Sequence, residues 1–582
     1  MELGYKKHDN DKLFIALEKT ELGLKQIQNY IPLYNNFFSL TDANWNNINL
    51  NNKLYLYSIK NKETDNIVNG ILKDINSSTK KKTTAFFKYS PLLDPLKYII
   101  GKYDIEDKNL LSLPSFTNQY SFHEKLKDSN NSAYVDSFFS YLTSTLLHTH
   151  GFLHGIDFYG SFLSIKENYP VNIYDDIEYI DEFDFFHKNK GVLFSVDDSY
   201  VDMVGNDTRN YKQKINVVNE QVELQLSDIS EIDSNLKTTR EITPTIGIIE
   251  VTHDTKPDII YENLIHKKKS STSTSSLSSC SSRSSNSSID RDDVNDDLNN
   301  SVFEDDLDNE DDLDNDNGSD GYSSIDGEEI IVKIKEFPVQ IIALECCEDT
   351  LNSLIEDDEH PLNDEEWESI VMQILISLIT YQNVFGLTHN DLHANNIMYT
   401  NTDKQFIYYK IDSTYYKVPT FGKLFKIIDF GRAIYKFKGQ LLCSDSFHPK
   451  GDASTQYNFP PYFNNKKPLI EPNFSFDLCR LGCSIYDYIV DDVSKESTVT
   501  SPIMRIIIDW CKDDKGRNIL YKKNGDERYP DFKLYKMISR KVHSHVPISV
   551  LRNMYFNKFK VTKNKIPKGK NIINIDEFPC YM

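Results

Sequence analysis

The sequence predicts a mixed α+β fold, with strands and a helix before residue 200 and a mainly helical part after residue 345. Two observations predict it. The first block alternates short apolar runs with turns, and the second contains a long amphipathic segment of more than five helical turns. A low-complexity stretch of serines and acidic residues separates the two blocks.

The first block holds one clear strand and one clear helix. KKTTAFFKYS, residues 81–90, has an apolar run that leads into Lys88 and predicts a strand. Residues 133–152 predict a helix, because apolar side chains recur at three- and four-residue spacings: Val135, Phe138, Phe139, Leu142 and Leu146.

The second block begins with VQIIALE, residues 339–345, which predicts a buried strand. Residues 363–386 predict the longest helix, with Asn363 as its N-cap and Glu366 completing a capping box. Its apolar stripe consists of Ile370, Ile374, Leu375, Leu378 and Ile379.

The net charge of −23 is concentrated in one segment. Residues 290–329 contain 18 acidic residues and one basic residue. Residues 267–327 have few large apolar groups, so we expect a disordered insertion there, and the polar stretch 206–243 is expected to be irregular. A serine run beside an acidic run suits phosphorylation by an acidophilic kinase, and a solvated spacer is the plainer alternative.

The eight cysteines form no C-x-x-C pair or disulfide pattern, which favours a reducing intracellular compartment. The N-terminus lacks an apolar h-region, and no apolar run reaches membrane-spanning length. We therefore expect a soluble intracellular protein with no membrane or nucleic-acid partner. The sequence does not indicate the oligomeric state.

Three motifs follow the long helix. LTHNDLHANNIMY contains the pattern H-x-D-x-x-x-x-N at His389, Asp391 and Asn396. An apolar run then leads into D-F-G at residues 429–431, and SFDLCRLGCSIYDYI predicts a helix that carries Asp477 near its start. Turn capping by short polar side chains is the plain alternative for Asp391 and Asn396.

In their order and spacing these motifs resemble the C-lobe of the protein kinase superfamily. The resemblance implies that Asp391 orients the acceptor hydroxyl and accepts its proton, and that Asn396 and Asp429 bind Mg²⁺ on the phosphates of ATP. It implies structural support from His389, Phe430, Gly431 and Asp477.

Within the superfamily, three features resemble the haspin-like branch. His393 stands where common Ser/Thr kinases have lysine, residues 400–424 predict an extended hairpin before D-F-G, and no A-P-E follows it. Haspin relatives do not keep D-F-G intact, whereas this chain does. Rich use of Asn, Lys, Ile and Tyr is typical of an AT-rich genome, and with the haspin-like features it suggests a member from a mimivirus-like giant virus.

The resemblance implies a two-lobed fold: an N-terminal extension over residues 1–45, an N-lobe of antiparallel sheet plus helix over 46–345, and a mainly helical C-lobe over 346–582. Lys88 in A-F-F-K resembles the phosphate-binding lysine, and Asp136 takes the place of its glutamate partner. Backbone groups from Glu345 to Cys347 are expected to meet adenine.

No G-x-G-x-x-G precedes Lys88, and the single glycine of the preceding segment, Gly70, is expected in a degenerate phosphate-covering hairpin. The sequence thus predicts an ATP- and Mg²⁺-dependent protein serine/threonine kinase acting on a protein substrate. The alternatives are a pseudokinase that binds nucleotide or partner proteins as a scaffold, which the missing glycines favour, and a small-molecule phosphotransferase, which His393 suggests.

Overall fold

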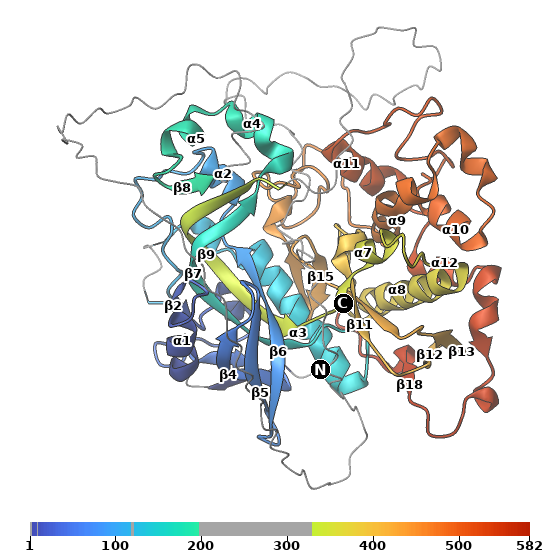
Figure 1. The fold of residues 1–582 in the computed structure, drawn as a ribbon, viewed down its shortest axis with the longest axis horizontal. Helices are drawn as coiled ribbons and strands as arrows, with labels where there is room; N and C mark the ends of the chain where they lie inside the picture. The colour runs from blue at the N-terminus through green and yellow to red at the C-terminus, as the bar shows by residue number, and fades with distance from the viewer. Residues whose placement is uncertain (1–2, 8–9, 118–121, 197–328) are drawn as a thin grey trace, which may run out of the picture. The chain divides into compact units, whose positions relative to one another are not determined.

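The computed structural model describes residues 3–7, 10–117, 122–196 and 329–582 (Figure 1). The expected irregular stretch 206–243 and the expected disordered insertion 267–327 lie outside the described residues. The fold is mixed α+β, as the sequence predicts, with an antiparallel sheet and a set of helices.

A seven-stranded antiparallel sheet forms the first part of the structure. Its strand order is β2-β7-β9-β6-β5-β4, and β8 pairs with β9. β9 comes after the segment that is not described, yet it lies in the middle of the sheet between β6 and β7. The strands span Leu24–Gln28 (β2), Leu54–Lys62 (β4), Ile67–Asp74 (β5), Lys80–Pro91 (β6), Phe158–Asn172 (β7), Phe194–Val196 (β8) and Ile331–Glu345 (β9).

The first 45 residues, which the sequence assigns to an extension, supply β2 to this sheet. They also contain α1 (Asp11–Glu18) and β1 (Tyr5–Lys7), and β1 pairs with β3 (Ile48–Leu50). The sheet therefore begins well before residue 46.

The side-chain alternation of β6 sets the direction of Lys88. Ala85 and Phe87 are fully buried, and Lys88 follows with the opposite orientation because successive strand side chains point to opposite faces. Helix α3, Ser132–His150, packs against β7 and β9. Its N-cap Asn131 accepts a hydrogen bond from the Ala133 amide.

The second part is mainly helical and is built around α8, Asp364–Phe385, which is buried over almost its whole length. Its predicted capping box between Asn363 and Glu366 is present, and Gly386 ends the helix in the left-handed region at φ 62°. The other described helices of this part are α7 (Leu351–Ile355), α9 (Phe476–Ile489), α10 (Pro502–Trp510), α11 (Phe532–Lys541) and α12 (Pro547–Leu551). Three short helices, α2 (Pro95–Ile99), α4 (Ile177–Asp181) and α5 (Asp184–Asn189), belong to the first part.

Small sheets complete the second part. One has the order β10-β11-β14, a second has the order β17-β13-β12-β18, and β15 and β16 form a hairpin. The hairpin expected between residues 400 and 424 is present as β12 and β13. The strands span Asp349–Thr350 (β10), Ile397–Asn401 (β11), Phe406–Ile411 (β12), Thr414–Pro419 (β13), Lys423–Ile427 (β14), Ile434–Phe437 (β15), Gln440–Cys443 (β16), Lys560–Val561 (β17) and Ile572–Asn574 (β18).

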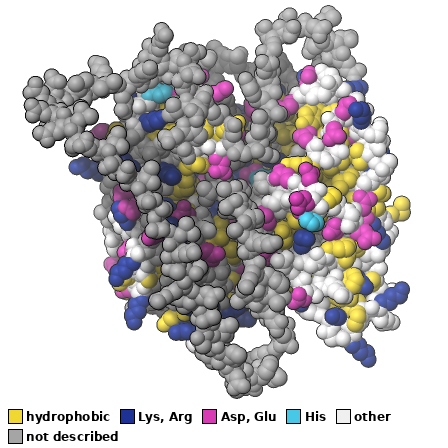
Figure 2. Space-filling view, in the orientation of Figure 1, with side chains coloured by type: hydrophobic (Ala, Val, Ile, Leu, Met, Phe, Trp, Pro, Cys, Tyr) yellow, Lys and Arg dark blue, Asp and Glu magenta, His cyan; other side chains and the backbone are white. Residues whose placement is uncertain are grey.

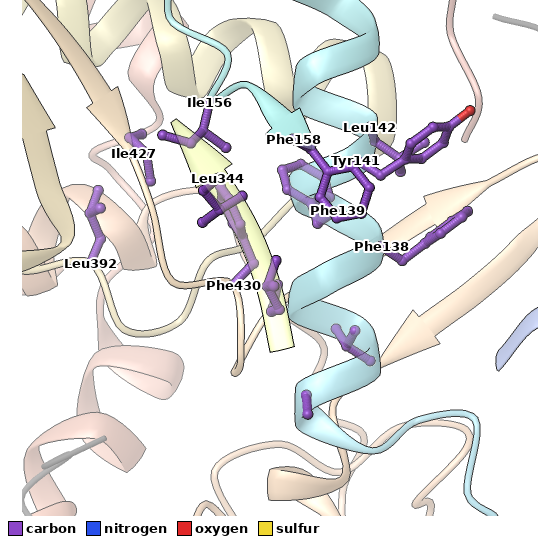
Figure 3. Packing of buried hydrophobic residues seen from close by; sticks show 14 of the residues in the cluster. Phe138, Phe139, Tyr141, Leu142, Ile156, Phe158, Leu344, Leu392, Ile427 and Phe430 are labelled. Atoms are coloured by element: carbon purple, nitrogen blue, oxygen red, sulfur yellow. The ribbon is translucent and has the colours of Figure 1, made fainter. Parts of the chain in front are cut away.

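One hydrophobic cluster runs from the sheet through α3 to α8. Figure 3 shows its centre, where Phe430 lies among side chains from α3 and β9. The rings of Phe139 and Phe430 have their centroids 4.5 Å apart, and Phe139 also contacts Tyr381 of α8 at 5.4 Å. Helix α3 is thus packed between the sheet and the segment that carries D-F-G.

Charged side chains of both signs are interspersed over the described residues visible on the face in Figure 2. The concentrated acidity of residues 290–329 belongs almost entirely to the segment that is not described. In the described part of the chain, no helix is both long and apolar enough to cross a membrane.

Removing the Phe139 ring should destabilise the protein strongly. Phe139 is fully buried, so Phe139→Ala should lower the free energy of unfolding by about 3–5 kcal/mol through lost burial and a residual cavity. Chemical denaturation measures the change. The matched control is Phe463→Ala, since Phe463 is 46% exposed and its loss should matter little. Equal effects of the two substitutions would contradict the proposed packing.

Candidate functional site

The loop between α8 and β11 is held in place by a buried carboxylate. Asp477 of α9 is fully buried, and its two oxygens accept hydrogen bonds from the amides of His389 and Asn390, both at 2.9 Å. Asn390 has a left-handed backbone at φ 66°, and its side chain donates to the Arg432 carbonyl at 2.9 Å. Asp477 therefore supports the loop, as expected, through two hydrogen bonds to its backbone.

His389 connects this loop to the strand that precedes D-F-G. Its Nδ1 accepts a hydrogen bond from the Asp391 amide at 3.3 Å, which leaves Nε2 to donate to the Ile428 carbonyl at 2.9 Å. His389 is fully buried. The histidine thus fixes the distance between the Asp391 loop and Asp429, and it makes no contact that suggests chemistry of its own.

The hydrogen bonds of its amide nitrogen orient the Asn396 side chain. Nδ2 donates to the Asp391 carbonyl at 2.9 Å and lies 3.1 Å from Nε2 of His393. Burial lowers the pKa of His393 to about 4, so this imidazole is neutral and accepts the hydrogen bond near neutral pH. The amide oxygen of Asn396 is the atom left to meet a cation.

Asp391 lies in a cationic environment that the sequence motifs do not reveal. Tyr535 of α11 donates its hydroxyl to Asp391 Oδ1 at 2.9 Å, and Arg432 Nη1 lies 4.0 Å from Oδ2. Burial opposes ionisation, but the charges of Arg432 and Arg480 and the hydrogen bond from Tyr535 hold the pKa of Asp391 below its ordinary value. The carboxylate is therefore ionised and fixed in direction.

Lys88 joins three parts of the structure. Its Nζ lies 2.7 Å from Asp136 Oδ2 on α3 and 2.8 Å from Asp429 Oδ1. The other oxygen of Asp136 accepts a hydrogen bond from the Phe430 amide at 2.9 Å. The expected Lys88–Asp136 pair is present, and Asp136 additionally holds the backbone of the D-F-G segment.

The two carboxylates beside Lys88 differ in their electrostatics. Burial raises the pKa of Asp136, and the neighbouring Asp429 charge adds to the effect against the pull of Lys88. For Asp429 burial acts in the same direction, but the charge and hydrogen bond of Lys88, with His389, hold its pKa below the ordinary value. Asp429 is therefore the more readily ionised of the two carboxylates. Its backbone is left-handed at φ 63°.

The remaining D-F-G residues serve packing and turning. The Phe430 ring is fully buried between α3 and the His389 ring, whose centroid is 5.4 Å away. The Gly431 amide lies 3.4 Å from Asp429 Oδ1. These contacts agree with the supporting positions expected for both residues.

At the end of β9, Glu345 is engaged with protein groups. Its amide donates to the Asp157 carbonyl at 2.9 Å, and its side chain forms an ion pair with Lys426. That amide is therefore engaged within the protein and is not free to meet adenine, contrary to the expectation for the backbone groups of Glu345. The assignment of Cys347 to nucleotide binding stays a prediction.

The hairpin expected around Gly70 is present as β5 and β6, with Gly70 inside β5, and its phosphate-covering role stays a prediction. Gly70 pairs with Ile59 and Thr83, and a Cβ at this position would stand 2.9 Å from the Ser58 carbonyl oxygen, so the close approach of β4 favours glycine. The turn beside the Lys88 strand is residues 63–66, where the Asn66 side chain donates to the Phe87 carbonyl at 2.8 Å. This turn has no glycine and carries two carboxylates, Glu63 and Asp65.

No cluster of three or more His, Cys, Asp or Glu side chains suited to a metal occurs among the described residues. The Asp429 carboxylate and Asn396 amide oxygen nevertheless fit Mg²⁺, which prefers oxygen ligands, is often bound through one or two protein groups, and takes its remaining ligands from phosphate and water. The donor set is thus suited to Mg²⁺ bound together with a nucleotide.

No protein-family model matches the chain, and a search of curated proteins finds no significant relative. A function is therefore inferred from the geometry of the site.

The structure adds Arg432, Arg480 and Tyr535 to the residues that the motifs indicated. Arg432 directly follows D-F-G and Arg480 lies in the helix of Asp477, so their proximity to motifs was visible in the sequence. Tyr535 lies in a helix with no motif, and only the tertiary fold brings it to Asp391.

Replacing Lys88 with methionine should destabilise the protein in a pH-dependent way. The change leaves Asp136 and Asp429 buried without their cation, which costs about 3–5 kcal/mol for a buried pair. Protonation of the two carboxylates relieves this cost. The loss of unfolding free energy should therefore be larger at pH 7 than at pH 5.

Urea denaturation at the two pH values measures this difference. Lys62→Met is the matched control, because Lys62 pairs with the exposed Asp65 and such surface pairs contribute about 0–1 kcal/mol. A Lys88→Met penalty that is the same at both pH values would argue against carboxylate repulsion as its cause.

Proposed function

We propose that this protein transfers the γ-phosphoryl group of ATP, with Mg²⁺, to serine or threonine hydroxyls of a protein substrate. The observation that carries the proposal is the convergence of Lys88, Asp136 and Asp429 in one ion-paired cluster, linked through His389 to the loop of Asp391 and Asn396. Phosphoryl transfer needs a lysine for the phosphates, oxygen ligands for the metal, and a carboxylate for the acceptor hydroxyl.

The arrangement of elements supports a two-lobed kinase-like fold. Lys88 lies on β6, the third strand of the β4-β5-β6 meander, and its carboxylate partner lies on the next long helix, α3. In protein kinases the corresponding lysine is on the third strand and pairs with a helix carboxylate. In this assignment the sheet with α3 is the N-lobe, and residues 346–582 form the C-lobe.

Each residue has a distinct part in the proposed transfer. Asp391 accepts a hydrogen bond from the acceptor hydroxyl and takes its proton as the oxygen attacks phosphorus. Asn396 and Asp429 would hold Mg²⁺, which neutralises phosphate charge when bound. Lys88 contacts the phosphates after exchanging its ion pair with Asp429, while Asp136 keeps it in place.

The haspin-like assignment is also a proposal. It is supported by His393, which holds Asn396 where a lysine is common, and by the hairpin β12–β13 before D-F-G. A viral source is suggested by residue usage alone.

A pseudokinase is the second candidate, and the turn 63–66 favours it. Two carboxylates and no glycine in this turn oppose close approach of phosphates to its backbone. A protein that keeps the fold for scaffolding would tolerate such a turn, whereas an efficient kinase must place its phosphates despite it.

Asp391→Asn should slow phosphoryl transfer about 10²–10⁴-fold, because it removes the group that accepts the hydroxyl proton. Steady-state transfer of labelled phosphate from ATP to a generic protein substrate measures this. Affinity for ATP should remain, since Asp391 contacts the acceptor hydroxyl rather than ATP in the proposed assignment.

Asp429→Asn should instead weaken the Mg²⁺-dependent part of nucleotide binding, measured as the rise in melting temperature with ATP and Mg²⁺ together. Asp526→Asn, a change in an exposed turn, is the control for both variants. Binding of ATP and Mg²⁺ without transfer by the wild-type protein would support the pseudokinase. Transfer undiminished in both variants would refute the assigned roles.

A further inference from the structure

Arg432 presents a buried donor that has no acceptor. The residue is 7% exposed, and its Nη2 donates to Asp452 Oδ2 at 2.6 Å. Its Nη1 lies 4.0 Å from Asp391 Oδ2, which is too far for a hydrogen bond, and it donates to no described residue. A buried charged donor without an acceptor is costly, so this nitrogen is suited to a ligand that supplies an oxygen.

Arg480 is linked to the other carboxylate oxygen of Asp391 through Tyr535. Its Nε donates to the Tyr535 hydroxyl at 2.9 Å, and the same hydroxyl donates to Asp391 Oδ1. Its two terminal nitrogens donate to no described residue, although its charge interacts with that of Asp391. The two terminal nitrogens of Arg480 can therefore still donate hydrogen bonds to a ligand.

The guanidinium groups of Arg432 and Arg480 both lie near the aromatic ring of Tyr535. The guanidinium carbons of Arg432 and Arg480 lie 5.6 Å and 5.1 Å from its centroid. At these distances the ring attracts both cations, while Arg432 Nη1 and the terminal nitrogens of Arg480 have no acceptor among the described residues. His393 adds no positive charge here, because its Nε2 accepts from Asn396. The local donors thus exceed the local acceptors.

We propose that Arg432 Nη1 and the terminal nitrogens of Arg480 form a phosphate-binding site beside Asp391. The inference deepens the proposed function and rests on it for the location of the reaction. Two guanidinium groups match the oxygens of a phosphoryl group, which accept paired hydrogen bonds. The phosphate can be the transferred γ-phosphoryl group or a phosphate already present on the acceptor protein.

The direct test is binding of inorganic phosphate to the full-length nucleotide-free protein, measured by calorimetry. Wild-type protein should bind phosphate saturably, and Arg480→Gln and Arg432→Gln should each weaken binding at least about tenfold, as expected for a charged hydrogen bond. Arg552→Gln is the matched control, because Arg552 forms an exposed ion pair with Asp412. Phosphate affinity in this variant should be unchanged.

Two further variants serve as controls. Arg432 is buried, so its substitution can unfold the protein. Tyr535→Phe keeps both arginines and removes only the hydroxyl that accepts from Arg480, so it should weaken phosphate binding less than Arg480→Gln. Lys88→Met identifies phosphate bound at the Lys88 cluster instead. Phosphate binding that is absent in the wild type, unchanged in Arg480→Gln, or lost only in Lys88→Met would overturn the proposal.

Kinetics with paired acceptor peptides, one carrying a phosphoserine beside the acceptor serine, separate the two sources of phosphate. If the site binds the γ-phosphoryl group, Arg480→Gln lowers kcat equally for both peptides and leaves KM for ATP unchanged. If it binds acceptor phosphate, Arg480→Gln raises KM for the phosphopeptide alone. Unchanged kinetics with both peptides would overturn the site's role. Absence of any transfer by the wild type would refute the proposed kinase activity and leave the binding measurement valid.

Discussion

The ion pairs of Lys88 connect the sheet, helix α3 and the D-F-G segment. A single ammonium group lies within 2.8 Å of carboxylates on both α3 and the segment after β14. Two carboxylates this close to each other repel unless a cation separates them. Asp136 also accepts a hydrogen bond from the Phe430 amide. Its side chain therefore connects helix α3 both to Lys88 and to the backbone of the D-F-G segment. Any rearrangement of one of the three parts must rearrange the others.

A second set of constraints acts on the loop that carries Asp391. Asp477 holds the loop backbone, His389 joins it to Ile428, and Tyr535 holds the carboxylate of Asp391. Each of these contacts uses a buried group with a defined partner, which makes the geometry rigid before any ligand arrives. Preorganisation of this kind lowers the reorganisation needed for a reaction, since the dipoles are already oriented.

The sequence predicted the local elements and the motif residues well, because both depend on short-range patterns. The capping box at Asn363, the β12–β13 hairpin and the pairing of Lys88 with Asp136 are all present. Tertiary context decided the rest. Gly70 lies in a strand of the expected hairpin, where close approach of the Ser58 carbonyl oxygen favours a residue without a Cβ. Residues 24–28 entered the sheet although nothing in their local pattern indicated pairing with β7. Tyr535 reaches Asp391 only through the docking of α11.

In the proposed function Lys88, Asp429, Asn396 and Asp391 surround one bound nucleotide and its metal. An experimental structure with Mg²⁺ and a non-hydrolysable ATP analogue is the decisive measurement. We expect Mg²⁺ bound by Asp429 and Asn396, and Lys88 still paired with Asp136 but moved from Asp429 to the phosphates. Nucleotide bound away from these residues, or a Lys88–Asp429 contact that persists with nucleotide present, would contradict the proposal.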